Sequence, residues 1–328
     1  MKTTVGLAGY GNWAREAYVP ALLDDSEVEI AAVAARSEET RRLASERFGA
    51  GVALYDDPFR LAREADVDAV MIGLPSGLVS DVAIAAIAAG KHAWLEPPPP
   101  GDSRIAALLD LAGRSGLVLH ADMELRYHPV VAAFAGLLED ELGPALSVRV
   151  IQRCNWAMTW DEGAIARGAM ASGLSIWYLD PVDALLDREP RRVDVMGARP
   201  RFPRAVEAGS ALVEYDGAVG EWVFNFRSPE RLSLRLEVAA LEGEAEADLM
   251  TGRYRYSAGS PEWVEAEAAP ALPAYGFVGM RECVAAFLGA VRGEGSSLTG
   301  PDVLGRVHAA VTAFDESVRS GVLSLIHI

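Results

Sequence analysis

The sequence has few of the features that mark membrane, nucleic-acid-binding or disulfide-stabilised proteins. Its two cysteines, Cys154 and Cys283, are far apart and fit no metal or redox motif, so we expect two buried thiols in a reducing cytosol. The apolar stretch 82–89 is far shorter than the ~20 residues that span a membrane. The net charge is −17 without a cluster of lysine and arginine, so the chain would repel the phosphates of nucleic acid. We therefore expect a cytoplasmic protein that binds neither a membrane nor nucleic acid.

What is present fits a globular chain with two domains. The 328 residues suffice for two domains of roughly 150 residues each, and 51% of them are hydrophobic. We place the domains at residues 1–121 and 122–322. The last six residues, 323–328, read as the translation of a common sequencing adapter, so we expect a non-native tail there, with a genuine apolar terminal strand as the alternative.

The first predicted strand ends in a glycine-rich turn that is typical of dinucleotide-binding folds. The apolar run 5–8 stops at Gly9, and Gly11 and Ala14 complete the spacing G-x-G-x-x-A. The first glycine makes the bend, the second lets the backbone approach a pyrophosphate, and the third small residue packs helix against strand. Residues 15–23 can continue as a helix. We therefore predict a dinucleotide-binding turn whose contacts are Gly9, Tyr10, Gly11, Asn12 and Trp13.

Strands and helices alternate along the rest of the N-terminal half. We predict strands at 28–34, 54–57, 68–73, 92–95 and 117–120, and helices at 38–48, 58–65, 79–89 and 103–115. The four prolines 97–100 cannot continue a central strand, so the chain leaves the sheet after Glu96. Together these elements predict a doubly wound Rossmann sheet of six parallel strands.

The end of the second predicted strand indicates which dinucleotide binds. A carboxylate usually occupies this place in NAD sites, but here Ala35 is followed by Arg36. A guanidinium group can hold a 2′-phosphate through paired hydrogen bonds, so we predict NADP(H), with NAD as the alternative. Arg36 as a solvated surface charge is the competing interpretation. The remaining predicted cofactor contacts are Ser37, Leu74, Pro75 and Glu96.

From Asp122 onward the pattern changes to alternating apolar and polar residues. We predict strands at 145–154, 192–197, 210–215, 221–227, 232–239 and 244–249, and helices near 128–138 and at 175–186, 279–291 and 301–320. The expected fold class is therefore α/β: an N-terminal Rossmann domain followed by a C-terminal α+β domain with an open, mainly antiparallel sheet.

The whole chain resembles the Gfo/Idh/MocA family of oxidoreductases. The segments that resemble it occur in order: GLAGYGNWA, AARSEE, DAVMIGLPS, AAGKHAWLEPP, MELRYHP and GAMASGLSIWYLD. The resemblance implies an NAD(P)-bearing Rossmann domain, hydride transfer to or from a small-molecule substrate, and a C-terminal domain that forms homodimers or higher homo-oligomers.

The resemblance breaks at the family's proton-transfer positions. The family's lysine position is Pro97, its aspartate position is Gly173, and its histidine position is Trp177. A histidine that the family often has elsewhere is Val79 here, and only the last acid of the pattern, Asp180, is kept. Proline, glycine and tryptophan have no titratable proton, so the familiar mechanism cannot use these positions.

Two carboxyl groups are the candidates that replace the lost residues. Glu124 lies where the family frequently has asparagine, and Asp180 is the surviving acid. Their alternative roles are an exposed carboxylate for Glu124 and a capping or packing group for Asp180. Further candidates, with a core or capping role as the alternative for each, are Tyr127, Tyr178 and His128, and an aromatic pocket of Trp156, Trp160 and Trp177.

Three functions remain open at this point. The first is an NADP(H)-dependent oxidoreductase that acts on a small carbonyl, imine or polyol-like substrate through an atypical active site. The second is a cofactor-binding protein without redox turnover, either a sensor or a partner of an active paralogue. The third is a lyase or isomerase that uses a tightly held nicotinamide transiently. We expect no metal site.

Overall fold

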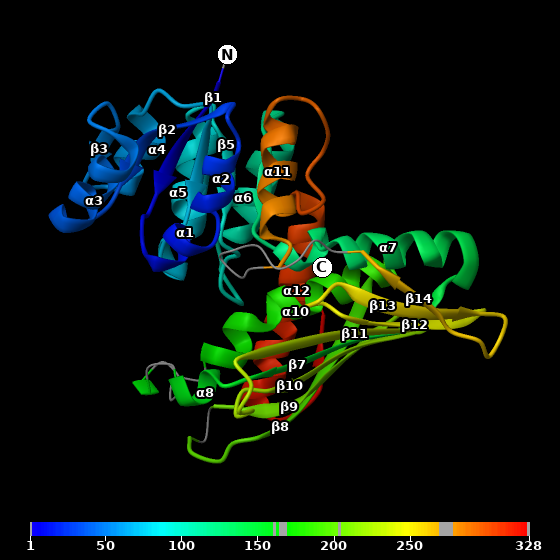
Figure 1. Cartoon of the computed structure of the whole chain (residues 1–328). Coiled ribbons are helices and arrows are strands. Elements are labelled where there is room, and N and C mark those ends of the chain that lie inside the picture. Colours follow the sequence, from blue (N-terminus) through cyan, green and yellow to red (C-terminus); the bar gives the residue numbers. More distant parts are fainter. Residues whose placement is uncertain (1, 160–161, 164–168, 203–204, 269–277, 327–328) are drawn as a thin grey trace. The chain divides into compact units, whose positions relative to one another are not determined.

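The computed structural model describes residues 2–159, 162–163, 169–202, 205–268 and 278–326 (Figure 1). The chain forms two compact units. The N-terminal unit comprises Met1–Met123 and Ala274–Gly305, and the C-terminal unit comprises Glu124–Pro273 and Arg306–Ile328. The first division lies two residues from the boundary expected at 121. The N-terminal unit additionally recruits residues 274–305, which the sequence-based division places in the C-terminal domain.

The N-terminal unit is built on six parallel strands, which confirms the predicted doubly wound sheet. Their spatial order is β3-β2-β1-β4-β5-β6. The strands are β1 Thr3–Ala8, β2 Val28–Ala34, β3 Ala53–Tyr55, β4 Ala69–Ile72, β5 His92–Leu95 and β6 Leu119–Ala121. The helices are α1 Asn12–Glu16, α2 Val19–Asp24, α3 Glu38–Phe48, α4 Pro58–Glu64, α5 Val79–Ala88, α6 Ile105–Ser115 and, from later in the chain, α11 Met280–Val291; a 3-10 turn, η1, spans Ser76–Leu78.

Helices cover both faces of this sheet, so its central strands are buried on both sides. On one face, Val5 and Leu7 of β1 pack in a cluster with Leu22 of α2 and with Val284 and Phe287 of α11. Helices α4 and α5 contact β1 and β4 respectively, and α6 packs beside α5. Burial on both faces explains why these strands consist of nearly continuous apolar runs.

The first helix is interrupted, which corrects the predicted continuous helix at 15–23. Helix α1 ends at Glu16, and α2 begins at Val19 after a turn through Ala17 and Tyr18. Pro20 lies in the first turn of α2, where its missing N–H and fixed φ are tolerated. The proline therefore starts a new helix instead of continuing the old one.

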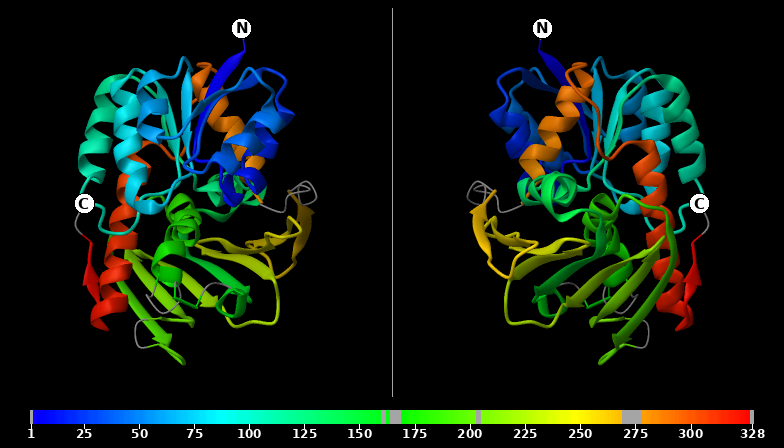
Figure 2. Two further views of the ribbon diagram at one scale, coloured as in Figure 1. Left: turned by 90° about the vertical axis from the view of Figure 1, so that its left-hand side faces the viewer. Right: turned by 90° about the vertical axis from the view of Figure 1, so that its right-hand side faces the viewer.

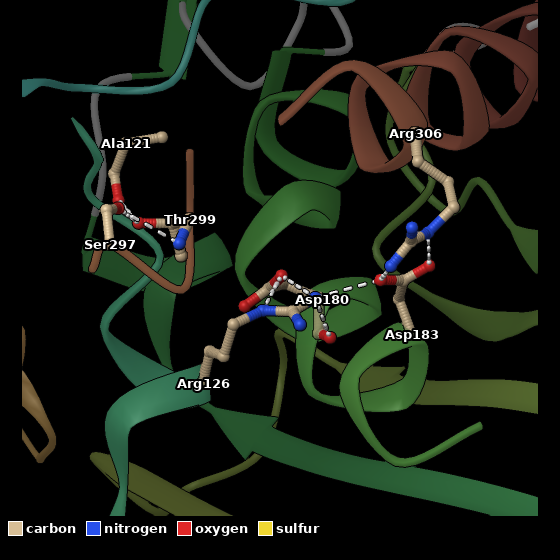
Figure 3. Close-up of polar contacts among 7 residues, drawn as sticks. All are labelled: Ala121, Arg126, Asp180, Asp183, Ser297, Thr299 and Arg306. Atoms are coloured by element: carbon tan, nitrogen blue, oxygen red, sulfur yellow. Dashed lines mark hydrogen bonds and ion pairs between the residues drawn. The ribbon is translucent and has the colours of Figure 1, made fainter. Parts of the chain in front are cut away.

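A segment from the end of the unit covers the open edge of the sheet beside β6. Ala121 N–H donates to Thr299 O at 3.1 Å, and Thr299 Oγ1 donates to Ala121 O at 2.8 Å (Figure 3). Ser297 Oγ lies 3.0 Å from Nδ1 of His120. These bonds satisfy main-chain groups that an edge strand would otherwise leave exposed.

The C-terminal unit contains a nine-stranded sheet that is antiparallel except where β10 runs parallel to β7. The strands are β7 Ala145–Cys154, β8 Pro190–Ala198, β9 Ala208–Tyr215, β10 Ala218–Asn225, β11 Leu232–Ala240, β12 Gly243–Asp248, β13 Arg253–Ala258, β14 Val264–Glu267 and β15 Ser324–Leu325. Strands β13 and β14 were not predicted, because they lie near the sheet edge and bury too few residues to show an apolar alternation. Ser324 and Leu325 of β15 pair with β8.

Helix α10, Ala169–Leu186, lies on one face of this sheet across β7 and β10 (Figure 2). It begins six residues before the predicted start at Ser175. The other helical elements are η2 Glu124–Tyr127, α7 Pro129–Leu137, a π-helical turn η3 Leu138–Leu142, α8 Trp156–Thr159 and α12 Pro301–Ser320. Among the residues described, no helix has the length and apolar character needed to cross a membrane.

Candidate dinucleotide and active site

The turn after β1 has the backbone that its glycines predict. Gly9 has φ 106°, a conformation that favours glycine, and its N–H donates to Ala34 O at 3.0 Å. A Cβ atom at Gly9 would lie 2.1 Å from Gly73 O. The ends of β1, β2 and β4 therefore meet here at a distance that only glycine allows.

Gly11 faces open space, which is what a turn that cradles phosphates requires. A Cβ atom built on Gly11 meets no heavy atom within 4 Å, and the residue is exposed at the start of α1. Asn12 is exposed, and its side-chain oxygen accepts a hydrogen bond from Arg15. The Tyr10 ring is buried against Phe48, so we expect only its main chain to contact a ligand.

Two arginines lie at the end of β2, where sequence reasoning identified one. Arg36 is exposed, while Arg41 Nη1 donates to Ala35 O at 2.6 Å and to Arg36 O at 2.9 Å. Ser37 caps α3 by accepting from Thr40 N–H at 3.1 Å. Arg41 belongs to the first turns of α3, and the Ser37 cap sets where that helix begins. The pattern of the strand alone therefore does not predict that the Arg41 side chain lies beside Arg36.

The ends of β4 and β5 hold the other predicted cofactor residues. Leu74 is partly buried, Pro75 is exposed, and Leu74 Cδ2 would lie 3.2 Å from a Cβ atom at Gly9. Glu96 is partly buried, and its N–H donates to Ile72 O at 3.0 Å. Pro97, at the family's lysine position, is buried directly after it.

Asp180 in the C-terminal unit lies within an ion-pair network and is not available as a free acid. Arg126 Nε donates to Asp180 Oδ1 at 2.8 Å, and Arg126 Nη2 lies 2.8 Å from Asp183 Oδ2 (Figure 3). Arg306 holds Asp183 through two hydrogen bonds of 2.8 Å. Burial raises the pKa of Asp180 to about 6, although the charge of Arg126 opposes this rise. A packing role for Asp180 is therefore supported.

Glu124 begins η2, the turn that also carries Arg126. It is partly buried with Oε2 inaccessible to solvent, so its interpretation as an exposed carboxylate is wrong. Its charge helps burial to raise the pKa of the Tyr178 hydroxyl. Tyr178 OH accepts from Gln152 Nε2 at 2.8 Å, and its ring stacks on Trp222 with centroids 5.2 Å apart. The alternative role of Tyr178, a core aromatic with a satisfied hydroxyl, is confirmed.

The remaining polar and aromatic candidates have mainly structural positions. His128 caps α7, since its Nδ1 accepts from Val130 N–H at 3.1 Å, which confirms its capping role. Tyr127 is buried. Trp160 lies outside the described residues. Trp177 is partly buried, and its indole N–H is inaccessible to solvent and finds no acceptor among the described residues.

Comparison with known proteins agrees with the geometry of the turn. A family model described as GFO_IDH_MocA, oxidoreductase family, NAD-binding Rossmann fold, matches residues 3–123. This match covers the first part of the N-terminal unit, including all six strands of its parallel sheet. No group of three or more histidine, cysteine, aspartate or glutamate residues in the described part of the chain is arranged to hold a metal ion.

Several proteins that this chain resembles are named for sugar chemistry. It is 38% identical over 137 residues to a dTDP-3,4-didehydro-2,6-dideoxy-alpha-D-glucose 3-reductase of Streptomyces violaceoruber, covering 41% of this chain and 39% of the relative. It is 29% identical over 252 residues to D-xylose 1-dehydrogenase (NADP(+)) 2 of Haloferax volcanii, covering 74% of each. The structure of a levoglucosan dehydrogenase with NADH and levoglucosan superposes with a TM-score of 0.84 at 18% identity, covering 100% of both chains. The last likeness shows a shared fold.

Proposed function

We propose that this chain is an NAD(P)-dependent oxidoreductase that prefers NADP(H) and acts on a small, sugar-like carbonyl, imine or polyol substrate. The observation that supports cofactor binding most directly is the turn itself: Gly9 is obligatory for its backbone, and the side of Gly11 is open. When bound, the nicotinamide would supply or accept the hydride. Names of the two curated relatives support a sugar-like substrate.

The chain's own residues would hold the cofactor at three places. Main-chain groups of 9–13 would hold the pyrophosphate, and Arg36 with Arg41 would hold the 2′-phosphate. Leu74 and Pro75 would line the nicotinamide side. The exposed guanidinium group of Arg36 supports NADP(H), because a dianionic phosphate needs a cation that has no competing carboxylate partner.

The test is a pair of binding titrations in which NADPH or NADH fluorescence follows complex formation. Arg36→Asp should weaken NADPH binding by at least about tenfold, since a charge-assisted phosphate contact contributes ~1.5–3 kcal/mol, and should change NADH binding little. Arg42→Asp is the matched control, because Arg42 is an exposed arginine on α3 whose partner is Glu46. Equal weakening of both dinucleotides by Arg36→Asp would refute the assignment of the 2′-phosphate site.

A cofactor-binding protein without redox turnover is the second candidate function. The observation that favours it is the burial of Asp180, the surviving family acid, in the network with Arg126 and Asp183. The indole of Trp177 cannot release a proton. A panel of sugars, carbonyls and imines assayed with NADPH distinguishes the two functions, and Glu124→Gln tests whether Glu124 donates the proton. Saturable NADPH binding without oxidation by any compound would favour the non-redox function.

We also propose that the chain forms homodimers or higher homo-oligomers through the open face of the nine-stranded sheet. Met196, Leu212 and Val219 expose apolar side chains on β8, β9 and β10. Light scattering of the purified protein tests this, and Leu212→Lys should shift the mass toward that of the monomer. A monomeric mass for the unmodified chain would refute it.

A further inference from the structure

Two carboxyl groups meet at the carboxyl edge of the N-terminal sheet. Strands β5 and β6 are parallel neighbours in which Leu95 pairs with Ala121. Glu96 and Asp122 follow these two residues directly, so both leave the sheet at the same edge. The Glu96 carboxyl group acts directly on the Asp122 carboxyl group and helps burial to raise its pKa. We call Glu96 and Asp122 the carboxyl pair.

Among the described residues, no positive charge contributes to the pKa of Asp122. Asp122 is fully buried, and its Oδ1 accepts from the Cys283 thiol at 3.9 Å. The Trp13 indole acts in the opposite sense and lowers the pKa of Asp122, but burial and Glu96 raise it by more. Asp122 Oδ2 is buried and receives no N–H, S–H or hydroxyl donor from the described residues. Two ionised carboxylates this close repel each other, and each can only accept hydrogen bonds, so the pair is more stable when one of its members holds a proton.

The other titratable groups that face the pair are neutral. The Tyr18 hydroxyl, between α1 and α2, is buried, and both acids help to raise its pKa. His120 on β6 lies 3.2 Å from Cys283 Sγ on α11, and burial lowers the pKa of His120 to about 3. Burial also raises the pKa of Asp122 well above its usual range. The shared proton therefore has no competing base among these neighbours.

The position of the carboxyl pair in the sheet corresponds to the nicotinamide end of a bound dinucleotide. In a sheet of order 3-2-1-4-5-6, the half formed by strands four to six holds the nicotinamide, at the carboxyl ends of the strands. The oxidised nicotinamide ring has a positive charge that the reduced ring lacks. A nearby carboxyl pair is therefore stabilised in its deprotonated form by the oxidised ring only.

We propose that Glu96 and Asp122 share one proton at neutral pH and form a proton-holding site at the nicotinamide half of the fold. Binding of NADP⁺ then releases this proton, whereas binding of NADPH does not. The coupling to the dinucleotide rests on the proposed function; the shared proton does not. Reduction of a carbonyl group adds one hydride to carbon and one proton to oxygen, and Pro97 has no proton to give. The pair holds a proton that meets this requirement.

The first experiment reads the shared proton without any cofactor. Infrared difference spectra between the unmodified protein and Asp122→Asn, recorded at neutral pH, should show the carbonyl stretch of one protonated carboxylic acid, which the variant lacks. Glu96→Gln should lose the same band and provides a second variant if Asp122→Asn does not fold. Glu64→Gln, an exposed acid on α4, is the control that should keep it. Absence of the band from the unmodified protein would overturn the proposal.

The second experiment measures the affinities for NADP⁺ and NADPH across a pH series. The affinity for NADP⁺ should rise with pH by up to about tenfold per unit relative to that for NADPH, as expected when one proton is released. The 2′-phosphate is common to both ligands, so its titration cancels. Asp122→Asn and Glu96→Gln should abolish the difference, and Glu64→Gln should retain it.

The outcomes separate the two proposals. An infrared band together with equal pH dependence for both dinucleotides would overturn the coupling. Failure of both dinucleotides to bind would refute the proposed function and the coupling, while the infrared band, measured without either ligand, would still decide whether the proton is shared.

Discussion

Replacing Arg126 with methionine should strongly destabilise the C-terminal unit. The Arg126 side chain is 10% exposed and links two carboxyl groups that are almost completely buried, those of Asp180 and Asp183. Methionine has a similar apolar stem but no charge, so Arg126→Met removes the cation while leaving much of the packing. Asp183 keeps both of its hydrogen bonds to Arg306. The loss therefore falls mainly on Asp180.

The expected loss follows from the burial of Asp180. Removing one partner of a buried ion pair costs about 3–5 kcal/mol, because the remaining charge is buried without compensation. Asp180 can reduce this cost by binding a proton, and its pKa should rise above the value of about 6 that it has beside Arg126. Above that value, the folded variant binds a proton that the folded unmodified protein does not bind. The additional loss should therefore grow by up to about 1.4 kcal/mol per pH unit above pH 6.

Urea unfolding at about pH 5.5 and about pH 7.5 measures both parts of this prediction. Arg149→Met is the control, because Arg149 is half exposed and pairs with Glu221 and Glu237, so its loss should stay below about 1 kcal/mol. The double variant Arg126→Met/Asp180→Leu should recover much of the stability by removing the stranded acid. If Arg126→Met lost no more than Arg149→Met, or lost equally at both pH values, the network would not contribute as described.

Four residues of the N-terminal unit give further predictions. Gly9→Ala would place a Cβ atom 2.1 Å from Gly73 O, so it should lower the melting temperature and abolish NADPH binding. Gly11→Ala, whose Cβ atom meets no neighbour, should keep the melting temperature and only weaken binding. Equal melting temperatures for the two variants would contradict this reasoning. The raised pKa of Asp122 means that stability should fall as pH rises above 3.8, by about 1.4 kcal/mol per unit, and melting curves of Asp122→Asn across pH should lose this slope. The pKa of about 3 for His120 means that the unfolded chain binds a proton at this residue before the folded protein does, so the free energy of unfolding should fall as pH drops from 6.5 towards 3. An NMR signal of the His120 ring that titrates near pH 6.5 would disprove this low pKa.

The sequence predicts the N-terminal sheet well because burial on both faces leaves a strong local pattern. Strand β2 and helix α3 have the predicted bounds, since a continuous apolar run and a Ser37 cap mark them unambiguously. Local pattern fails where position in the sheet determines burial, as in β13 and β14. Local pattern also cannot show which core an amphipathic helix joins, so the grouping of α11 with the N-terminal unit could not be predicted from it.

Some features of the candidate site can also be predicted from the sequence, and others cannot. The turn at Gly9 is readable because its conformation requires glycine at one position. The carboxyl pair was not recognised, because Glu96, Asp122 and Cys283 are brought together only by strand order and by the return of α11. Likewise, the ion-pair network of Arg126, Asp180, Asp183 and Arg306 is built from η2, α10 and α12, and no spacing in the sequence predicts it.

The return of α11 to the N-terminal unit has a consequence for synthesis of the chain. Met280, Val284, Phe287 and Leu288 belong to the same apolar cluster as β1 and α2. A nascent chain that has been synthesised only up to Met123 therefore lacks α11, which covers part of its sheet. This cover is complete only when residue 291 has been synthesised. At 5–20 residues per second, this interval lasts roughly ten to thirty seconds. During that time the uncovered face is a surface that chaperones can bind, and a fragment ending at 123 should aggregate where the complete chain does not.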